Sequence, residues 1–393
     1  MSVLVFCCGG ECGVATSSAG HAAKNGSGTL SWDTTTFRSG LRSIRFVSAA
    51  NNVYIEASAT GLNVRTVGRF YVRFATLPNA DCIIAGISSA DGPAVTFKVS
   101  DSKLYASIGT NFGASGVSVT TGIWYRVDFN FLIQSGGSPD LSDAQIDGVA
   151  VGQASFDNAG LTSAATIAFG IRNTCTADLY IDDIAVSNTA ADYPLGAGHV
   201  ISSIPDADGT HNVAGANDFE RTLTGTDITN GTTTAWQLVA DRPLPTTAVD
   251  FINGIAPPNS TDYVELDYAA FTGETLAPNG VECIFVHHDA SGAGTNSFTI
   301  TLRHNTGATS ANVFSGTTNV GATITYKRAH FATIPGGAAW TLAAANDLRT
   351  RFLVADASPD PYIDALMLEA DFPERSMPPM FHRPRYAWNR RVL

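Results

Sequence analysis

The sequence predicts an all-β protein built from two tandem β-sandwich domains of jelly-roll type. Charged residues make up only 15% of the 393 residues, and glycine occurs 37 times. This composition favours short strands and turns over long helices with charged faces. Apolar–polar alternations recur at a spacing of roughly ten residues with turn residues between them, as in sandwiches and barrels. A closing strand, LYIDDIAV at 179–186, returns in a looser form as YIDALML at 362–368, which indicates a second domain.

The first domain is expected to span residues 1–192. In its closing strand Leu179 and Ile181 share one face, whereas Ile184 and Val186 have the opposite parity. A one-residue β-bulge at Asp182-Asp183 would return the apolar side chains to the core, so we predict a bulge there. The other strands are expected at 3–6, 42–47, 52–56, 68–74, 95–99 and 125–131, where the last two alternate most clearly.

The second domain is expected at 245–372, after an irregular connection at 193–244 that is rich in turn-forming residues. One helix is predicted in it, from Leu342 to about Phe352. Thr341 can cap the N-terminus of this helix, and two arginines suit its C-terminal end. Strands are expected at 263–268, 281–287, 298–303 and 322–327, and the second closing strand ends the domain.

The last segment, 373–393, is predicted to be an extended arm. Its prolines oppose regular structure, while its arginines and aromatic residues suit stacking and ion pairing. Such an arm suits docking on an acidic neighbouring surface. The rest of the chain is itself acidic, so a strap along its own domain is the alternative. The residues predicted to dock are Arg383, Arg385, Tyr386, Trp388, Arg390 and Arg391.

Charge and hydropathy exclude several classes of partner. The net charge of −12 disfavours nucleic-acid binding and favours solubility. No stretch approaches the roughly eighteen apolar residues of a transmembrane helix, so no membrane partner is expected. The start at 1–8 has no basic region and only a very short apolar run, which predicts synthesis in a cytoplasm without a secretory signal.

Four short segments of the first domain occur in the order and spacing of a known family. They are LVF at 4–6, FRSGLRSIRF at 37–46, WYRV at 124–127 and YIDDI at 180–184. With them, nearly all of the first 190 residues resemble the concanavalin A-like (laminin G-like) jelly rolls of bacteriophage virion proteins. The second domain is similar to a β-domain of phage structural proteins in which a segment like GAAWT at 337–341 leads into a short helix and a final strand.

The resemblance implies a non-enzymatic structural component of a tailed-phage virion, made in the host bacterial cytoplasm. It would be an exterior capsid decoration or tail-associated protein that docks on other virion proteins through its C-terminal arm. Symmetric particles imply a homo-oligomer, such as a trimer. Because this sandwich also hosts lectins and hydrolases, the alternative is a carbohydrate-binding module of a tail fibre or tip that binds a host surface glycan. Its aromatic contacts would be Trp32, Trp236 and Tyr263.

A glycoside hydrolase is the third hypothesis, and the sequence disfavours it. Retaining hydrolysis needs two carboxylates about 5 Å apart. Glu265 and Asp267 share a strand face, but hydrolases with this pattern carry a further glutamate where alanines stand at 269–270. The histidines at 287–288 point to opposite faces of a strand, so only one of them could join a metal site. The protein is therefore predicted to have no catalytic residues.

Two further groups could bind a metal ion. Asp182 and Asp183 could hold calcium, although calcium needs six to eight oxygen ligands and the carboxylates also suit backbone amides at the predicted bulge. Cys7, Cys8 and Cys12 lie close together and could hold a metal or form a disulfide. Scattered cysteines in such a protein are more often small buried apolar side chains. No cofactor is therefore predicted.

Overall fold

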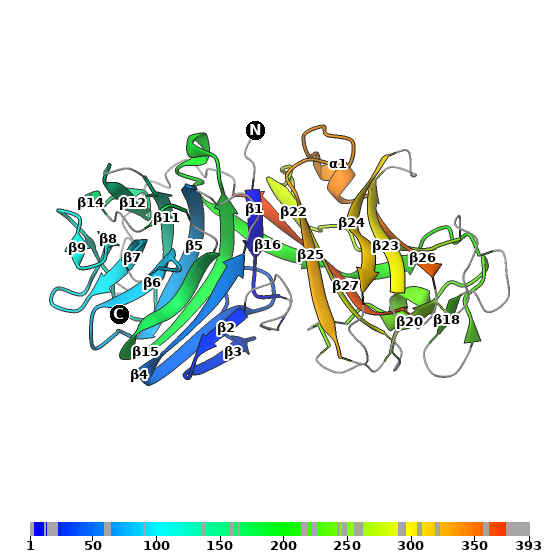
Figure 1. The fold of residues 1–393 in the computed structure, drawn as a ribbon, viewed down its shortest axis with the longest axis horizontal. Coiled ribbons are helices and arrows are strands. Elements are labelled where there is room, and N and C mark those ends of the chain that lie inside the picture. The colour runs from blue at the N-terminus through cyan, green and yellow to red at the C-terminus, as the bar shows by residue number, and fades with distance from the viewer. Residues whose placement is uncertain are drawn as a thin grey trace, which may run out of the picture.

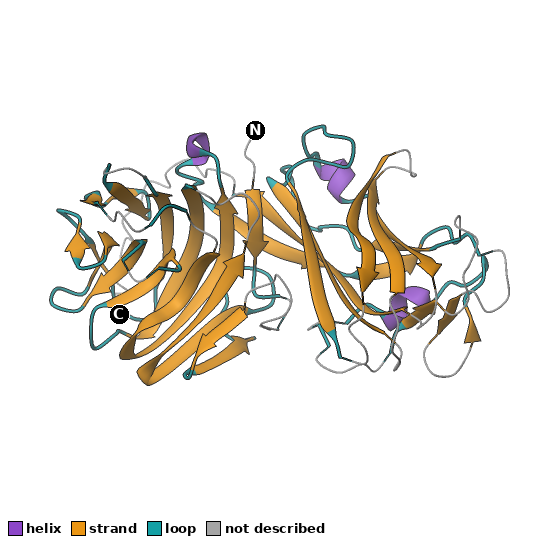
Figure 2. Cartoon of the chain, viewed as in Figure 1, coloured by secondary structure: helices purple, strands orange, loops and turns teal. Residues whose placement is uncertain are grey.

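The computed structural model describes residues 4–11, 13, 23–58, 64–89, 91–134, 138–157, 161–163, 166–213, 219–221, 226–241, 244–245, 250–254, 262–289, 296–304, 309–318, 323–356 and 361–374. Strands dominate this part of the chain, and its helices are short (Figure 2). The antiparallel sheets are curled, and the predicted all-β sandwich class is confirmed. Among the residues just given, no helix is long and apolar enough to cross a membrane.

The first half of the chain forms one antiparallel sheet that curls around a single apolar core. Its central strand is β15 (Thr166–Ser187), which pairs with β1 (Leu4–Cys8), β4 (Ser43–Ser58), β5 (Arg65–Thr76) and β6 (Cys82–Ile87). The remaining elements are β2 (Ala23–Gly26), β3 (Thr29–Asp33), β7 (Pro93–Lys98), β8 (Lys103–Ile108), β9 (Asn111–Phe112), β10 (Val117–Ser118), β11 (Trp124–Leu132), β12 (Asp140–Ile146), β13 (Val149–Ala150), β14 (Ala154–Phe156) and the 3-10 helix η1 (Ala190–Asp192).

The predicted bulge in β15 is confirmed. The register between β15 and β5 shifts between Asp182 and Ala185, and Asp183 has a left-handed backbone with φ of 52°. Apolar residues on both sides of the bulge enter the same core, including Ile181 before it and Ile184 after it. The extra residue therefore restores the inward direction of the apolar side chains, as expected for an insertion into a strand with period two.

The second half is a sandwich of two antiparallel sheets around a separate core. In the larger sheet β27 (Pro361–Pro373) pairs with β16 (Gly198–Ser203), β20 (Ile252–Gly254) and β22 (Gly280–Asp289). The sheet also contains β18 (Phe219–Arg221), β19 (Thr226–Asp227) and β25 (Thr325–Phe331). The smaller sheet consists of β17 (Pro205–Asp208), β21 (Val264–Tyr268), β23 (Asn296–His304), β24 (Thr309–Thr318) and β26 (Leu348–Asp356). The helices are η3 (Ala235–Leu238) and α1 (Leu342–Ala345).

The prediction of an irregular connection at 193–244 is wrong. β16 pairs along its whole length with β27, and β17 pairs with β21 of the other sheet. The segment is polar because parts of both strands remain accessible to water. Its pairing partners lie far downstream in the sequence, so local composition could not reveal that the segment forms strands.

The prediction of a long helix from Leu342 to Phe352 is only partly correct. Thr341 caps the helix as predicted, because its Oγ1 accepts a hydrogen bond of 3.1 Å from the backbone N–H of Ala344. The helix ends at Ala345, and β26 begins at Leu348. From Leu348 to Val354 buried residues alternate with partly exposed ones, which is the period of a strand.

The two halves meet at a junction formed by β1, β16 and the end of β27 (Figure 1). The guanidinium carbon of Arg328 on β25 lies 4.1 Å from the ring centroid of Phe6 on β1. A Cβ atom on Gly9 would lie only 2.6 Å from the carbonyl oxygen of Val200, so the two backbones are in close contact there. Arg69 of β5 pairs with Asp371 of β27, and both side chains are fully buried. The halves therefore keep separate apolar cores and share a buried polar interface.

Candidate functional site

A row of alternating cationic and aromatic residues crosses the outer face of the first sheet. Tyr180 of β15 lies directly opposite Arg45 of β4 on one side and Arg73 of β5 on the other. Arg73 in turn lies opposite Trp124 of β11. The guanidinium carbons of Arg45 and Arg73 are 5.4 and 5.6 Å from the Tyr180 ring centroid, within cation–π range. The alternate residues of the same strands fill the core, which directs this row outward.

The two arginines of this row have different partners. Arg45 forms a two-pronged ion pair with Asp178, with distances of 3.0 and 2.7 Å. Arg73 donates from Nε to the carbonyl oxygen of Gly122 at 3.1 Å, and it forms no ion pair with any residue that the structure describes. Its side chain and that of Trp124 are partly exposed. The charge of Arg73 therefore remains available to an anionic ligand.

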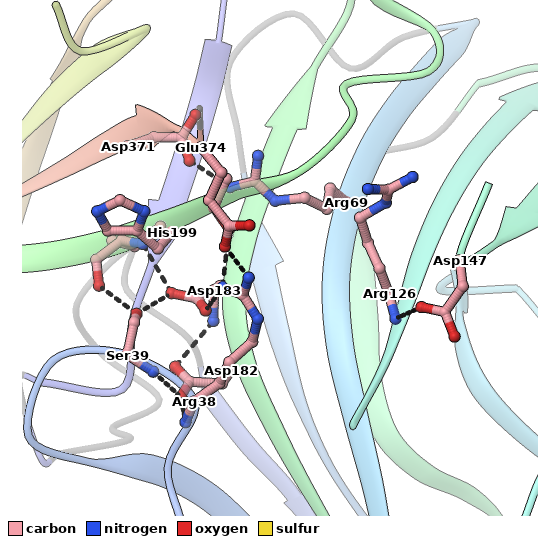
Figure 3. Close-up of polar contacts among 12 residues, drawn as sticks. Arg38, Ser39, Arg69, Arg126, Asp147, Asp182, Asp183, His199, Asp371 and Glu374 are labelled. Atoms are coloured by element: carbon pink, nitrogen blue, oxygen red, sulfur yellow. Dashed lines mark hydrogen bonds and ion pairs between the residues drawn. The ribbon is translucent and has the colours of Figure 1, made fainter. Parts of the chain in front are cut away.

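A second row lies beside the first, nearer the junction. Tyr71 of β5 is opposite Asp182 on β15 and Arg126 on β11. The guanidinium carbon of Arg38 lies 3.5 Å from the Tyr71 ring centroid, and burial raises the pKa of the Tyr71 hydroxyl. The backbone N–H of Arg126 donates to Asp147 at 2.8 Å (Figure 3). We name the residues of both rows that carry guanidinium or aromatic groups the arginine–aromatic face: Arg45, Arg73, Arg126, Tyr71, Tyr180 and Trp124.

A cavity of about 360 Å³ lies where this face approaches the second half. It is lined by His199 of β16, by residues 273–276, and by Pro373 and Glu374 after β27. Glu374 pairs with Arg38, and His199 Nε2 lies 2.9 Å from Glu274 Oε1. Figure 3 shows Glu374 pointing from the second half toward Arg38 and Asp183 of the first. The cavity is therefore lined by the second half alone, and Glu374 connects its wall to the first half.

The bulge carboxylates Asp182 and Asp183 hold the loop that carries Arg38. Asp182 Oδ2 accepts from the backbone N–H of Arg38 at 2.8 Å, and Asp182 Oδ1 accepts from the N–H of Asp183 at 2.8 Å. Asp183 accepts from Ser39 Oγ at 2.5 Å and from the N–H of Val200 at 2.7 Å. Burial, together with the charge of Asp183, raises the pKa of Asp182. These carboxylates thus accept hydrogen bonds from backbone amides at the bulge. This is the second of the two roles that the sequence suggests for them, the first being calcium binding.

The pair Glu265 and Asp267, considered for hydrolysis, is held by arginines of the neighbouring strands. Glu265 is 2% exposed and accepts hydrogen bonds from Arg303, at 3.0 Å, and from Arg351. Arg349 Nε lies 3.1 Å from Asp267 Oδ1. Each carboxylate therefore has a cationic partner, and the pair forms an ion cluster on the smaller sheet in which Glu265 is buried and Asp267 is partly exposed.

The remaining sequence candidates lie apart from one another. Trp32 lies directly opposite Ile44 on the neighbouring strand, so both side chains lie on the same face of the first sheet. Ile44 is part of the first core, so this face is the core side. Trp236 packs on the second core, and the ring of Tyr263 is covered by Arg351 at 3.6 Å. The structure does not bring these three aromatic residues together, because Trp32 lies on β3 of the first half, whereas Trp236 in η3 and Tyr263 before β21 belong to the second.

Histidines 287 and 288 also have separate environments. His287 lies in an aromatic cluster, and its ring nitrogens have no hydrogen-bond partner among the described residues. His288 Nδ1 lies 2.8 Å from Asp364 Oδ2. Of the cysteines within the described residues, Cys82, Cys175 and Cys283 are buried and free, as predicted. Cys7 and Cys8 are also buried. Cys12 and the predicted docking residues lie outside the described residues; the latter are Arg383, Arg385, Tyr386, Trp388, Arg390 and Arg391.

The sequence did not predict the arginine–aromatic face, although the alternation of residues in one strand contains part of the pattern. In the strand at 68–74 the residues that alternate with the apolar set are Arg69, Tyr71 and Arg73. The sequence thus indicates that one strand carries cations and an aromatic ring on its outer side. It cannot show that residues 45, 124 and 180 lie beside them, because that depends on strand order and register.

Comparisons with known proteins complete the description of the site. No family model matches the chain, and no curated protein matches it. Among solved structures, an endo-β-1,4-glucuronan lyase from the fungus Trichoderma reesei is 14% identical with a TM-score of 0.36, over 48% of this chain and 98% of that chain. The tandem CBM22 domains of Paenibacillus barcinonensis Xyn10C are 10% identical with a TM-score of 0.28, over 94% and 98%.

Domain 4 of AbnA, a GH43 extracellular arabinanase from Geobacillus stearothermophilus, solved with arabinotriose, is 12% identical with a TM-score of 0.33, over 47% of this chain and 92% of that chain.

Proposed function

We propose that the protein binds an anionic polysaccharide, rich in uronate groups, on the arginine–aromatic face and does not cleave it. The observation that carries this proposal is the in-register row Arg45–Tyr180–Arg73–Trp124 across four adjacent strands. An extended row of alternating charges and rings suits a chain ligand whose repeating units carry both carboxylates and flat C–H faces. A compact ligand would engage only part of it.

Each residue type in the row has a chemical role toward such a ligand. A guanidinium binds a carboxylate through two parallel hydrogen bonds, which gives both affinity and orientation. An indole presents a large apolar surface at low conformational cost, on which a sugar ring can stack. Arg73 supplies the cation that has no carboxylate partner among the described residues, and Trp124 supplies the ring beside it. The two together form the centre of the proposed site.

The net charge of the chain is −12, so the arginine–aromatic face is a local group of cations on an acidic molecule. A polyanion is repelled by the molecule as a whole, so attraction must come from a local group of cations at short range. Binding through a few arginine–carboxylate contacts should therefore weaken as salt is added, because exposed charge pairs are screened. A glycan held only by stacking and neutral hydrogen bonds would show little salt dependence.

We propose that the ligand is not cleaved, because the acids beside the row are already engaged by arginines. The acids on this face already have partners, since Asp178 is held by Arg45 and Asp128 by Arg126. The only strand pair that resembled a hydrolase dyad, Glu265 and Asp267, is held by arginines on a different sheet. The setting that we propose is a phage particle, in line with the resemblance of the first domain, and antibody labelling of purified particles tests that setting.

The binding test compares a polyuronate with a neutral glucan of similar length. Calorimetric titration of the full chain should show saturable binding of the polyuronate and none of the glucan. Arg73→Ala and Trp124→Ala should each weaken binding by roughly tenfold or more, because each removes a contact of one to a few kcal/mol. Lys98→Ala is the matched control, since Lys98 also covers an aromatic ring, at 4.8 Å from Phe112, but on β7.

Equal affinity of Arg73→Ala and the parent chain would contradict the proposed face. Absence of polyuronate binding by the parent chain would contradict the proposed function itself. Release of shortened sugar chains during the titration would contradict the claim that the protein does not cleave its ligand.

A further inference from the structure

Two glutamates and one histidine form a row on the second half of the molecule, and this row faces β1 of the first half. Glu282 of β22 lies directly opposite His330 of β25 on one side and Glu369 of β27 on the other. Directly opposed residues of antiparallel strands share one face of the sheet. Glu282 and Glu369 are both 0% exposed. The two carboxylates are therefore buried in the junction, and His330 is partly exposed.

Cys7 meets this row from the first half. On β1, Phe6 and Cys8 enter the first core, so Cys7 between them points to the second half. The N–H of Cys7 donates to Glu282 Oε2 at 3.2 Å. Its Sγ atom, a carboxylate oxygen of Glu282 and a ring nitrogen of His330 all lie within 4.8 Å of one another. Three chemically different ligand atoms thus converge from three strands.

Several polar atoms of this group have no hydrogen-bond partner among the described residues. They are both ring nitrogens of His330 and both carboxylate oxygens of Glu369. A buried polar group without a partner costs about 1–3 kcal/mol, and native proteins contain few of them. A bound cation would take a lone pair from one ring nitrogen of His330 and from a carboxylate oxygen of Glu369, which would give both groups a partner.

We propose that Cys7, Glu282 and His330 bind a divalent transition-metal ion of the zinc type, with the carboxylate of Glu369 as the fourth ligand. Zinc is bound by thiolate, imidazole and carboxylate in tetrahedral geometry, at about 2.0–2.3 Å. Ligand atoms of such a site are roughly 3.5 Å apart, so small rotations of the Cys7, Glu282 and His330 side chains, whose ligand atoms lie within 4.8 Å of one another, bring these three to ligand spacing. Calcium and magnesium are poor candidates because they prefer oxygen ligands.

The charges of the group fit a divalent ion. Arg328 Nη2 lies 2.9 Å from Glu282 Oε1, so this pair is neutral without a metal. A Cys7 thiolate and a Glu369 carboxylate would bring two negative charges to the ion, which its charge of +2 neutralises, and His330 would bind as a neutral imidazole.

The other charged groups around the site are Asp371, which is paired with Arg69, and Glu11, whose Oε1 accepts from the N–H of Arg42 at 3.1 Å. Protons compete with the metal for a thiol and an imidazole, so the affinity should fall in acid. The metal would also link β1 of the first half to three strands of the second.

The test uses the full chain, stripped with a chelator and titrated with Co²⁺ and Zn²⁺. One Co²⁺ should bind per chain and give a thiolate-to-metal charge-transfer band, which Zn²⁺ then displaces. Cys7→Ser should abolish the band, whereas Cys82→Ser, which changes a buried cysteine of the first core, should keep it. His330→Asn should weaken binding by about a hundredfold, whereas His287→Asn, which changes a buried histidine of this half, should leave it unchanged.

Two outcomes would overturn the proposal. The first is a parent chain that shows no thiolate band with Co²⁺. The second is a band that survives Cys7→Ser and is lost in Cys12→Ser, because the ion would then be held elsewhere. If Cys7→Ser fails to fold, the comparison of His330→Asn with His287→Asn decides the question, and equal affinities of those two variants would refute the site.

Discussion

The imidazole of His287 lies in an aromatic cluster of the second core, 5.5 Å from the Phe285 ring and 5.4 Å from the Phe298 ring. Burial lowers the pKa of His287 to about 4. The folded protein therefore holds this histidine neutral, while the unfolded chain binds a proton near its ordinary pKa of about 6.5. The contribution of the neutral ring to stability is complete above that value and is lost as the pH falls toward 4.

His287→Leu should make the protein less sensitive to acid. Between pH 7 and pH 5 the parent chain should lose about 2 kcal/mol of unfolding free energy through protonation of this one group in the unfolded state. The variant should lose that much less over the same interval. Urea unfolding at both pH values measures the difference, and an equal loss in both proteins would show that His287 does not titrate as described.

The short helix α1 begins after an N-cap at Thr341, and it ends where the sequence changes from helical to strand periodicity before β26. Thr341 satisfies the N–H of Ala344, which would otherwise have no intrahelical acceptor. The chain then leaves the helix because Leu348, Phe352 and Val354 can all be buried only with the period of a strand. In β26, Arg349 and Arg351 do not end a helix as predicted but point to Asp267 and Glu265.

Thr341→Ala should lower the unfolding free energy by about 1 kcal/mol, the usual value of an N-cap side chain. The loss arises because the Ala344 N–H would have no side-chain acceptor. Thr341→Ser keeps a hydroxyl at the same position and is the matched control, for which we expect little change. Denaturant titration measures both variants, and an equal loss in Thr341→Ser would mean that packing, and not the cap, is responsible.

At the scale of the whole molecule, the junction makes one body of two separately cored halves. Arg69 and Asp371 belong to different halves, and each neutralises a charge that burial would otherwise make costly. Val200 donates its N–H to Asp183 across the same boundary. Separation of the halves would therefore leave several buried charges without partners or expose them to water. The unfolding of the two halves should therefore be coupled.

Arg69→Met should uncouple the halves. Removing one partner leaves Asp371 buried without its cation, which costs about 3–5 kcal/mol. Calorimetry should show one transition for the parent chain and two for the variant, because each half retains its own apolar core. Arg45→Met is the control, since it removes a more exposed ion pair with Asp178 that contributes less than about 1 kcal/mol. A single transition in Arg69→Met would show that other contacts couple the halves.

The sequence by itself determined the all-β class, the bulge at Asp182-Asp183 and the cap at Thr341. These follow from alternation, parity and capping chemistry, which act over a few neighbouring residues. Only the tertiary structure decided that Arg45, Tyr180 and Arg73 form one row, or that Cys7 meets Glu282 and His330. Strand order and register depend on turns and on core packing between distant segments. A local pattern shows which side of a strand a residue occupies, but it does not show which residue lies across from it.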